Sequence, residues 1–237
     1  VIASSEAEAR AFRELAGPGA PDVFRGLRNG VDLGAPPGPP RDDGRTVLFA
    51  GKMSYHANEA AARRLIEGVM PKVWRVRPDA RLVIAGKDPS DAIKALAQPG
   101  RLEVTGFVAD LRDVMARSTV LAAPLVYQAG IQNKVLEAMA MGVPVVTSRA
   151  AAGGVDAEAD HHFLVADTPQ ELAAAILRIV ADPAERARLA TSGRERMLSH
   201  HAWPNSMQRL DTIIERCVSG YARRAGSASA RTLRTPA

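Results

Sequence analysis

Short apolar segments alternate with longer segments of helical periodicity from Thr46 to about residue 165, and this alternation constrains the fold more than any other feature. The apolar segments lack the polar–apolar alternation of half-exposed strands, so both of their faces are expected to be covered. Strands that are separated by helices predict right-handed crossovers and a parallel sheet. We expect strands at 46–50, 81–85, 102–105, 120–124, 144–147 and 162–165.

The segments between these strands carry apolar residues at helical spacing. Over 58–75, the residues Ala61, Leu65, Val69 and Val73 recur once per turn and form an apolar stripe. Further helices are expected at 90–97, 109–117, 133–141, 168–181, 183–199 and 204–219. The predicted fold class is therefore α/β, with a Rossmann-like, doubly wound parallel sheet followed by C-terminal helices.

The first residues form a separate unit in the predicted organisation. Val1–Ala3 is typical of the end of a buried strand, and Ser5 with Glu8 makes a capping box for a helix that runs to about Leu15. We interpret 1–28 as the last strand–helix unit of an upstream domain; the alternative is an arm that packs on the main body. The Pro- and Gly-rich segment 29–45 is predicted to be a linker, and 46–219 the main domain.

The charge balance argues against nucleic-acid binding. The formal net charge is +5, from 31 Lys and Arg against 26 Asp and Glu, and five arginines beyond residue 215 account for the whole excess. We therefore expect 220–237 to be a basic, flexible tail, able to touch an acidic membrane surface, on a body that is neutral overall. The single cysteine excludes an intramolecular disulfide, and no apolar run reaches the length of a membrane-spanning helix.

Ligands of open parallel sheets bind beyond the carboxyl ends of the strands, so the loops there hold the candidate site residues. After the first strand of the main domain, Gly51 allows close approach to the backbone and Lys52 is placed to meet a phosphate. Asn58 is a suitable cap for the next helix, and His56 is a further candidate. The alternative for this loop is an ordinary connection with a solvated lysine.

The helix expected at 133–141 begins at a second candidate loop. Its first N–H groups, from Asn133 on, have no internal acceptors and attract anions. Lys134 lies in the first turn, where the helix dipole disfavours a cation unless an anion binds there. Glu137 follows one turn later, within reach of sugar hydroxyls. Alternatively, Lys134 and Glu137 are a surface pair that stabilises the helix by about 0.2–0.5 kcal/mol.

The other loops give weaker signals. Phe107 is interpreted as a residue that covers the core rather than as a platform for a nucleotide base, although the backbone near it could contact a base. Gly153 and Gly154 permit a close backbone approach. The sequence contains neither a DxD triplet nor an HExxH motif, so we assign no metal site and no catalytic histidine.

The segment GIQNKVLEAMAMGVPVV at 130–146 resembles the donor-site motif of family 4 retaining glycosyltransferases, which have the GT-B fold. The stretch 169–176 and the pairs Asp182-Pro183 and Ala202-Trp203 agree with that family. The segments GKMSYHANEAA and GIQNKVLEAMAMG resemble more narrowly the sugar transferases of the PEP-CTERM/exosortase system, which are implicated in exopolysaccharide assembly. The resemblance covers about residues 1–215 and corresponds to the C-terminal, donor-binding half of the fold.

This resemblance implies transfer of a hexose from a nucleotide-diphosphate sugar to a glycan or polyprenyl-linked acceptor, without a bound metal. Lys52 corresponds to a diphosphate-binding arginine, and Glu137 to the second glutamate of a Glu-x7-Glu motif, which binds the ribose. The remaining matches are the diphosphate and sugar loop at Gly130, Ile131 and Gln132, the base segment at Phe107 and Val108, and the glycine pair Gly153 and Gly154. A cytoplasmic protein, peripheral at the inner membrane, is expected.

Two positions depart from the family pattern. Ala129 stands where the first glutamate of the motif is expected, and Asn58 stands near the position of a diphosphate lysine, whose charge Lys134 replaces from the other loop. The catalytic residues are expected in the upstream domain, so the chain should bind the donor but transfer sugar poorly. The alternatives are a nucleotide-sugar epimerase of the same fold and a non-catalytic nucleotide-sugar-binding module.

Overall fold

The computed structural model describes residues 1–19, 23–32, 41–127 and 131–232, and the side chains of these residues except 222–232. It forms two compact units. The larger unit spans Val31–Ala202, and the smaller one combines Val1–Gly30 with the segment that begins at Trp203. Each unit is described by itself below.

The larger unit is built on a parallel sheet of six strands in the order β5-β4-β3-β6-β7-β8. The strands are β3 (Thr46–Ala50), β4 (Arg81–Ala85), β5 (Leu102–Gly106), β6 (Val120–Ala123), β7 (Val145–Thr147) and β8 (Leu164–Val165). All five neighbouring pairs are parallel, as the alternation of apolar and helical segments predicts. The α/β fold class and all six strands expected from the sequence are confirmed, with ends that shift by at most two residues.

The helices follow the strands in the predicted order. The first is continuous from α2 (His56–Arg63) through a π-helical segment (η1, Arg64–Val69) into α3 (Met70–Val76), where Pro71 lacks the N–H of a regular helix. The others are α4 (Asp91–Lys94), α5 (Leu111–Ala116), α6 (Asn133–Ala140), α7 (Arg149–Ala152), α8 (Pro169–Ala181) and α9 (Pro183–His200). The segment predicted at 90–97 is helical only over α4, and α7 was not expected.

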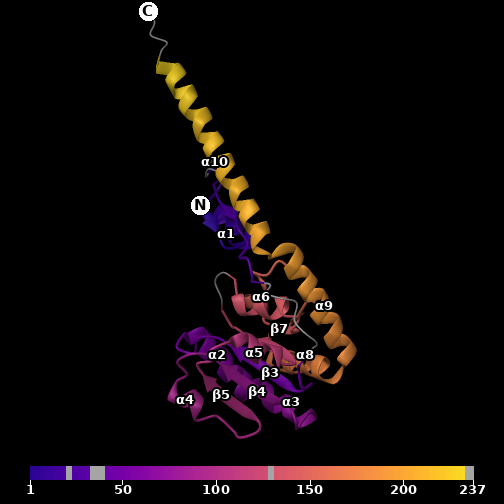
Figure 1. The fold of residues 1–237 in the computed structure, drawn as a ribbon. Coiled ribbons are helices and arrows are strands. Elements are labelled where there is room, and N and C mark those ends of the chain that lie inside the picture. Colours follow the sequence, from indigo (N-terminus) through magenta and orange to yellow (C-terminus); the bar gives the residue numbers. More distant parts are fainter. Residues whose placement is uncertain (20–22, 33–40, 128–130, 233–237) are drawn as a thin grey trace, which may run out of the picture. The chain divides into compact units, whose positions relative to one another are not determined.

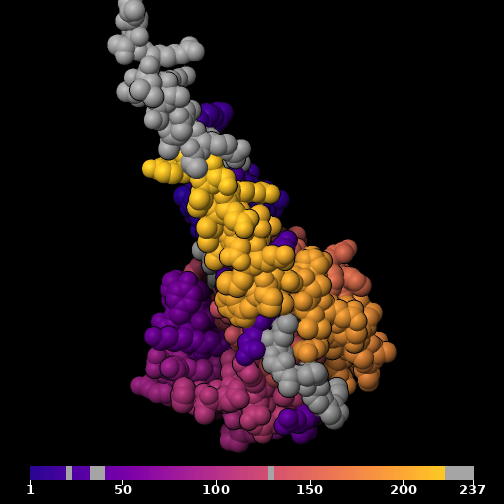
Figure 2. Space-filling view, turned by 45° about the horizontal axis from the view of Figure 1, so that its top comes forward, coloured from indigo at the N-terminus to yellow at the C-terminus, as the bar shows by residue number. Residues whose placement is uncertain are grey.

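The order of the strands places the helices on both faces of the sheet (Figure 1). The chain moves outward from β3 to β5, returns beside β3 as β6, and then moves in the opposite direction to β8. Because such crossovers are right-handed, α2–α3 and α6 lie on opposite faces. The last helices complete the layers: α8 packs on α3 and α9 on α6, and the orange residues of α9 cover one side of this unit in Figure 2. The order reverses between β3 and β6, which is where open sheets bind ligands.

The smaller unit pairs β1 (Ile2–Ala3) with β2 (Arg25–Gly26) around α1 (Glu6–Ala16). Ser5 caps α1 as predicted, but Glu8 accepts from Ser4, one residue before the cap, rather than closing the capping box on Ser5. The long helix α10 (Trp203–Thr232) belongs to the same unit, because Arg209 donates to the Gly26 carbonyl and pairs with Glu6.

Two boundaries of the predicted organisation are wrong as a result. Residues 203–219 group with the N-terminal unit instead of the domain at 46–219, and the helix expected to end at 219 continues to Thr232. The flexible tail predicted from residue 220 is therefore helical over its first residues. Of the predicted linker at 29–45, residues 33–40 lie outside the described residues, while Val31 bridges to Ala202 and Asp43 accepts from the N–H of Thr46. No helix in the described ranges is long and apolar enough to cross a membrane.

The loops after β3 and β4 approach each other backbone to backbone. The Gly51 N–H donates to the Ala85 carbonyl at 2.9 Å, and the Met53 N–H donates to the Lys87 carbonyl at 2.8 Å. Gly86 has φ +139°, and a Cβ there would lie inside the van der Waals surface of the Gly51 carbonyl oxygen. Glycine at 86 is therefore what lets the two loops meet.

We expect Gly86→Ala to destabilise the protein by more than the roughly 1–3 kcal/mol of backbone strain alone. Gly100→Ala is the matched control, because Gly100 also has a positive φ, +76°, but a Cβ there meets nothing within 4 Å. Urea denaturation of both variants gives the two free energies of unfolding. Equal losses would contradict a role for the close approach of the loops.

Candidate functional site

The loops that follow β3 and β6 are joined by a polar contact at the point where the strand order reverses. The Lys134 ammonium, on α6, donates to the Asn58 side-chain oxygen at 2.7 Å. The Asn58 amide nitrogen donates in turn to the Lys52 carbonyl at 2.9 Å. Asn58 was predicted to cap α2, but it is buried inside the helix, and the cap position is Tyr55. Asn58 thus links Lys134 to the loop that begins at Gly51.

Gly51 leaves the space that this contact occupies. A Cβ at Gly51 would lie 2.8 Å from the Asn58 amide nitrogen and 2.9 Å from Lys134 Nζ, closer than real Cβ contacts come. The ammonium also lies over the ring of buried Phe49, 4.6 Å from its centroid. This cation–π interaction stabilises the charged amine in its partly desolvated position.

Burial lowers the pKa of the Lys134 amine to about 8, although the nearby Glu137 carboxylate opposes the shift. Desolvation disfavours a charged amine, and a neutral amide oxygen compensates only in part. An anion that bound beside the amine would favour its charged form. The position is therefore suited to a negatively charged ligand.

The two helices that meet at this contact begin without side-chain caps. Neither the Tyr55 side chain at α2 nor the Gln132 side chain at α6 accepts a hydrogen bond from the first turn. The helices after β4, β5 and β7 differ, because their first turns are capped by Ser90, Asp110 and Ser148. Uncapped first turns present N–H groups and the positive end of the helix dipole to a ligand. The first turn of α6 contains no acidic residue.

Lys52 lies on the solvent side of this contact. Its side chain is 64% exposed, and its ammonium is 3.8 Å from the Asp88 carboxylate. An exposed ion pair of this kind contributes about 0–1 kcal/mol, so the lysine can exchange it for a ligand. The structure thus brings the Lys52 backbone and Lys134 together at Asn58, while the Lys52 amine reaches outward.

The other predicted residues of α6 and its loop surround the helix start. Ile131 packs against the core, Gln132 is buried, and Asn133 opens the helix with an exposed side chain. Glu137 is exposed one turn after Lys134, as a role at a sugar hydroxyl requires. Gly130 lies outside the described residues, as does Ala129.

The interpretation of Phe107 as a residue that covers the core is wrong. Its ring is 66% exposed, and the Lys87 ammonium lies 5.2 Å from the ring centroid. Gly106, directly before it, has φ +67°, a conformation that turns the chain sharply at the end of β5. Phe107 and the half-buried Val108 are therefore accessible to a ligand, which leaves their predicted contact with a base open to test.

Gly153 and Gly154 follow the short helix α7. Gly153 has an ordinary right-handed conformation, and its N–H donates to the Arg149 carbonyl at 3.2 Å, so it ends a helical turn. His56 is exposed at the start of α2, where its ring stacks on that of Tyr127. Sequence reasoning missed Tyr127, Phe49 and the bridging role of Asn58, because each depends on which loops become neighbours.

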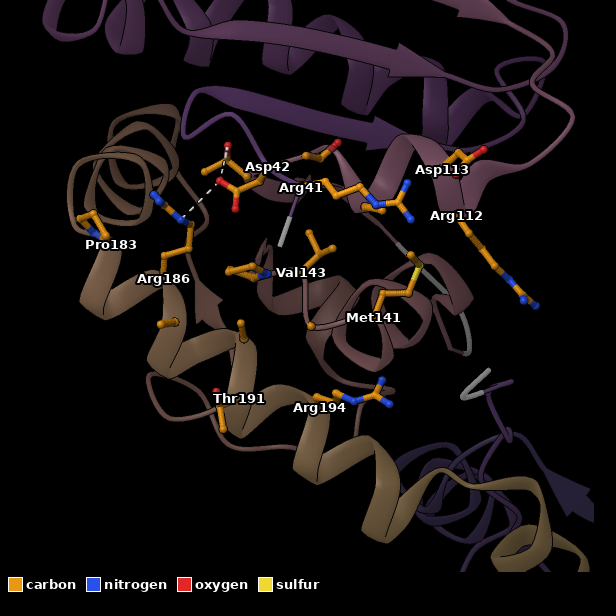
Figure 3. Close-up of a pocket in the computed structure, with 17 residues that line it drawn as sticks. Arg41, Asp42, Arg112, Asp113, Met141, Val143, Pro183, Arg186, Thr191 and Arg194 are labelled. Carbon is orange, nitrogen blue, oxygen red and sulfur yellow. Dashed lines mark hydrogen bonds and ion pairs between the residues drawn. The ribbon is translucent and has the colours of Figure 1, made fainter. Parts of the chain in front are cut away.

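A cavity of about 500 Å³ lies at the opposite edge of the sheet, near the amino ends of β6 and β7 (Figure 3). The Arg186 Nε atom lies 3.5 Å from the Asp42 carboxylate there, and Arg194 donates to the Ala140 carbonyl at the end of α6. These arginines thus satisfy groups of the protein itself. In the part of the chain that the structure describes, no three His, Cys, Asp or Glu side chains are grouped so that they could hold a metal ion.

Comparison with known proteins gives a consistent result. Residues 44–182 match the family model described as "Glycosyl transferases group 1". A glycogen synthase of Mycobacterium tuberculosis is 30% identical over 205 residues, which cover 80% of this chain and 47% of that protein. An alpha-maltose-1-phosphate synthase of the same species is 27% identical over 227 residues, which cover 83% and 58%. The chain thus spans about half the length of these curated relatives.

Solved structures share the fold. The Anabaena protein Alr3699/HepE, in complex with UDP and glucose, superposes with a TM-score of 0.73 at 19% identity, over 91% of this chain and 62% of that one. Sucrose-phosphate synthase from Thermosynechococcus elongatus gives a TM-score of 0.75 at 22% identity, over 93% and 58%.

The lowered pKa of Lys134 predicts a pH dependence of stability. Between about pH 8 and pH 10.5, the ordinary pKa of a lysine, the unfolded chain binds more protons at Lys134 than the folded one, so the free energy of unfolding rises with pH. We expect the wild type to gain about 1–3 kcal/mol relative to Lys134→Met between pH 7.5 and 10.5. Urea unfolding of both proteins at several pH values measures the difference. Parallel pH profiles would show that Lys134 titrates normally.

Proposed function

The chain belongs to the group 1 glycosyl transferases, and from this premise we propose that its larger unit binds the diphosphate of a nucleotide-sugar donor between α2 and α6. The observation that supports this most directly is the contact of Lys134 with Asn58 at the start of two uncapped helices. A partly buried ammonium and two helix starts without side-chain caps offer a diphosphate both charge and the positive ends of two helix dipoles. They do so at the reversal of the strand order, where ligands of such sheets bind.

The predicted side chains have separate roles in this proposal. Lys134 supplies the charge that the family motif places near Asn58, and Lys52 leaves its exposed ion pair with Asp88 to reach the phosphates. Glu137 binds the ribose, and the exposed segment at Phe107 meets the base. The positive charge of these groups makes a bound metal unnecessary in the proposed complex, so chelators should not change the affinity.

The wider role follows from the motif resemblance. We propose that the transferred sugar is a hexose, that its anomeric configuration is retained, and that the acceptor is a glycan or a polyprenyl-linked sugar. The sequences of the two loops, GKMSYHANEAA and GIQNKVLEAMAMG, support a function in exopolysaccharide assembly with the PEP-CTERM/exosortase system. The larger unit is proposed to be the donor-binding half of a two-domain GT-B enzyme.

A second candidate is a nucleotide-sugar-binding module without transfer activity, which the alanine at 129 favours. Incubation with a nucleotide sugar and a range of sugar acceptors separates the candidates. A glycosylated product supports the transferase, an isomerised donor indicates an epimerase, and unchanged donor with measurable binding supports the module.

We expect Lys134→Ala to weaken binding of a nucleoside diphosphate about tenfold or more, because a charge-assisted hydrogen bond is lost. Binding of the parent nucleoside should change little, since it carries no phosphate. Calorimetric titration of UDP, GDP and their nucleosides, with and without EDTA, measures both.

Lys94→Ala is the matched control for this experiment. Lys94 is an exposed lysine of α4 that pairs with Asp91, and its loss should leave all affinities unchanged. Equal weakening of nucleoside and nucleoside diphosphate in Lys134→Ala would contradict the diphosphate role. Absence of binding at millimolar concentrations would contradict the proposed function.

A further inference from the structure

The rings of Tyr55, His56 and Tyr127 form a cluster at the carboxyl edge of the sheet, hereafter the ring cluster. The rings of His56 and Tyr127 are stacked, with centroids 5.3 Å apart and planes at 26°. Tyr55 meets His56 edge to face, with centroids 4.9 Å apart. The cluster thus joins the start of α2 to the loop after β6.

These are the same two loops that the contact of Lys134 with Asn58 joins. His56 and Asn58 are two residues apart in the first turn of α2, so they point to different sides of that helix. Lys134 reaches one side, in a position that is largely buried, and Tyr127 reaches the other. The segment around the start of α2 is therefore joined to the segment that runs from β6 into α6 twice, once by a partly buried polar contact and once by exposed rings.

The exposure of the rings is more than a structural clamp requires. Tyr127 is 46% exposed and Tyr55 is 47% exposed, and Val126 beside them is 62% exposed. Aromatic rings that only fastened two loops would gain most by being buried. Exposed aromatic faces with polar tips, next to a predicted phosphate site, are suited to a ligand that has one apolar face and many hydroxyls.

A pyranose ring has this chemistry. Its axial C–H bonds form an apolar patch of slightly positive hydrogens, which packs on the negative face of an aromatic ring, while its hydroxyls reach tyrosine O–H groups or water. In a sugar nucleotide the pyranose is bonded to the terminal phosphate, so a sugar lies next to whatever holds the diphosphate.

We propose that the ring cluster, with Tyr127 as its main contact, is the platform on which the hexose of the donor stacks. The proposal rests on the proposed function, since the sugar of the donor is bonded to the diphosphate that Lys134 is proposed to bind. It assigns binding of the sugar to a ring, Tyr127, that the sequence analysis did not single out.

Titration of UDP, UDP-glucose, GDP and GDP-mannose against wild type and Tyr127 variants tests this. Tyr127→Ala should weaken binding of the nucleotide sugars about three- to tenfold and that of UDP or GDP less than twofold. Tyr127→Phe, which keeps the ring, should retain nearly all the affinity. Tyr127→Leu, which keeps apolar bulk without a ring, should behave like Tyr127→Ala. Tyr221→Ala is the control, because Tyr221 is 72% exposed on α10 in the other unit.

The outcomes separate the platform from the function on which it rests. Equal weakening of UDP and UDP-glucose by Tyr127→Ala would show that the ring holds the base or fastens the loops, and would overturn the platform. Unchanged affinities in all variants would overturn it as well, while the proposed function would stand. If the wild type bound no nucleoside diphosphate at all, the proposed function would fail and the platform with it.

Discussion

Coverage of the six-stranded sheet on both faces is the constraint on which the rest of the structure depends. Because the central strands β3, β4 and β6 are mainly apolar and buried, polar groups collect at the two edges of the sheet. At the amino edge, arginines such as Arg194 satisfy the carbonyl ends of helices. At the carboxyl edge, between β3 and β6, an ammonium and two uncapped helix starts come together instead. The chemical difference between the edges follows from strand direction and from one reversal of strand order.

The carboxyl edge is assembled by small residues as much as by charged ones. Gly86 allows the loops after β3 and β4 to meet, and Gly51 leaves room for the Lys134 amine and the Asn58 amide. The same closeness desolvates Lys134 and moves its pKa towards neutrality. Gly86 thus serves the backbone packing of the loops, and Gly51 the close packing around the Lys134 amine.

Local patterns predicted the sheet well, because burial on two faces leaves a run of apolar residues that is visible in the sequence. They predicted the start of α2 less well: Asn58 has the chemistry of a cap, but its side chain is used inside the helix for a contact with Lys134 that spans 76 residues. Phe107 was misjudged because an apolar residue after a strand usually covers the core, whereas the turn at Gly106 exposes it. The assignment of α10 to the smaller unit depends on Arg209 meeting Glu6 across 203 residues, which no local pattern shows.

The contact between Lys134 and Asn58 has a consequence for how such proteins are compared. A positive charge beside a ligand is defined by a point in space, and two loops that converge on this point can each supply it. If the two loops share the charge as proposed, an alignment that compares one column at a time records the amide at residue 58 as a lost cation and the lysine at 134 as an unrelated gain. Superposed amine nitrogens, rather than aligned letters, are the proper measure of whether a site of this architecture has kept its charge.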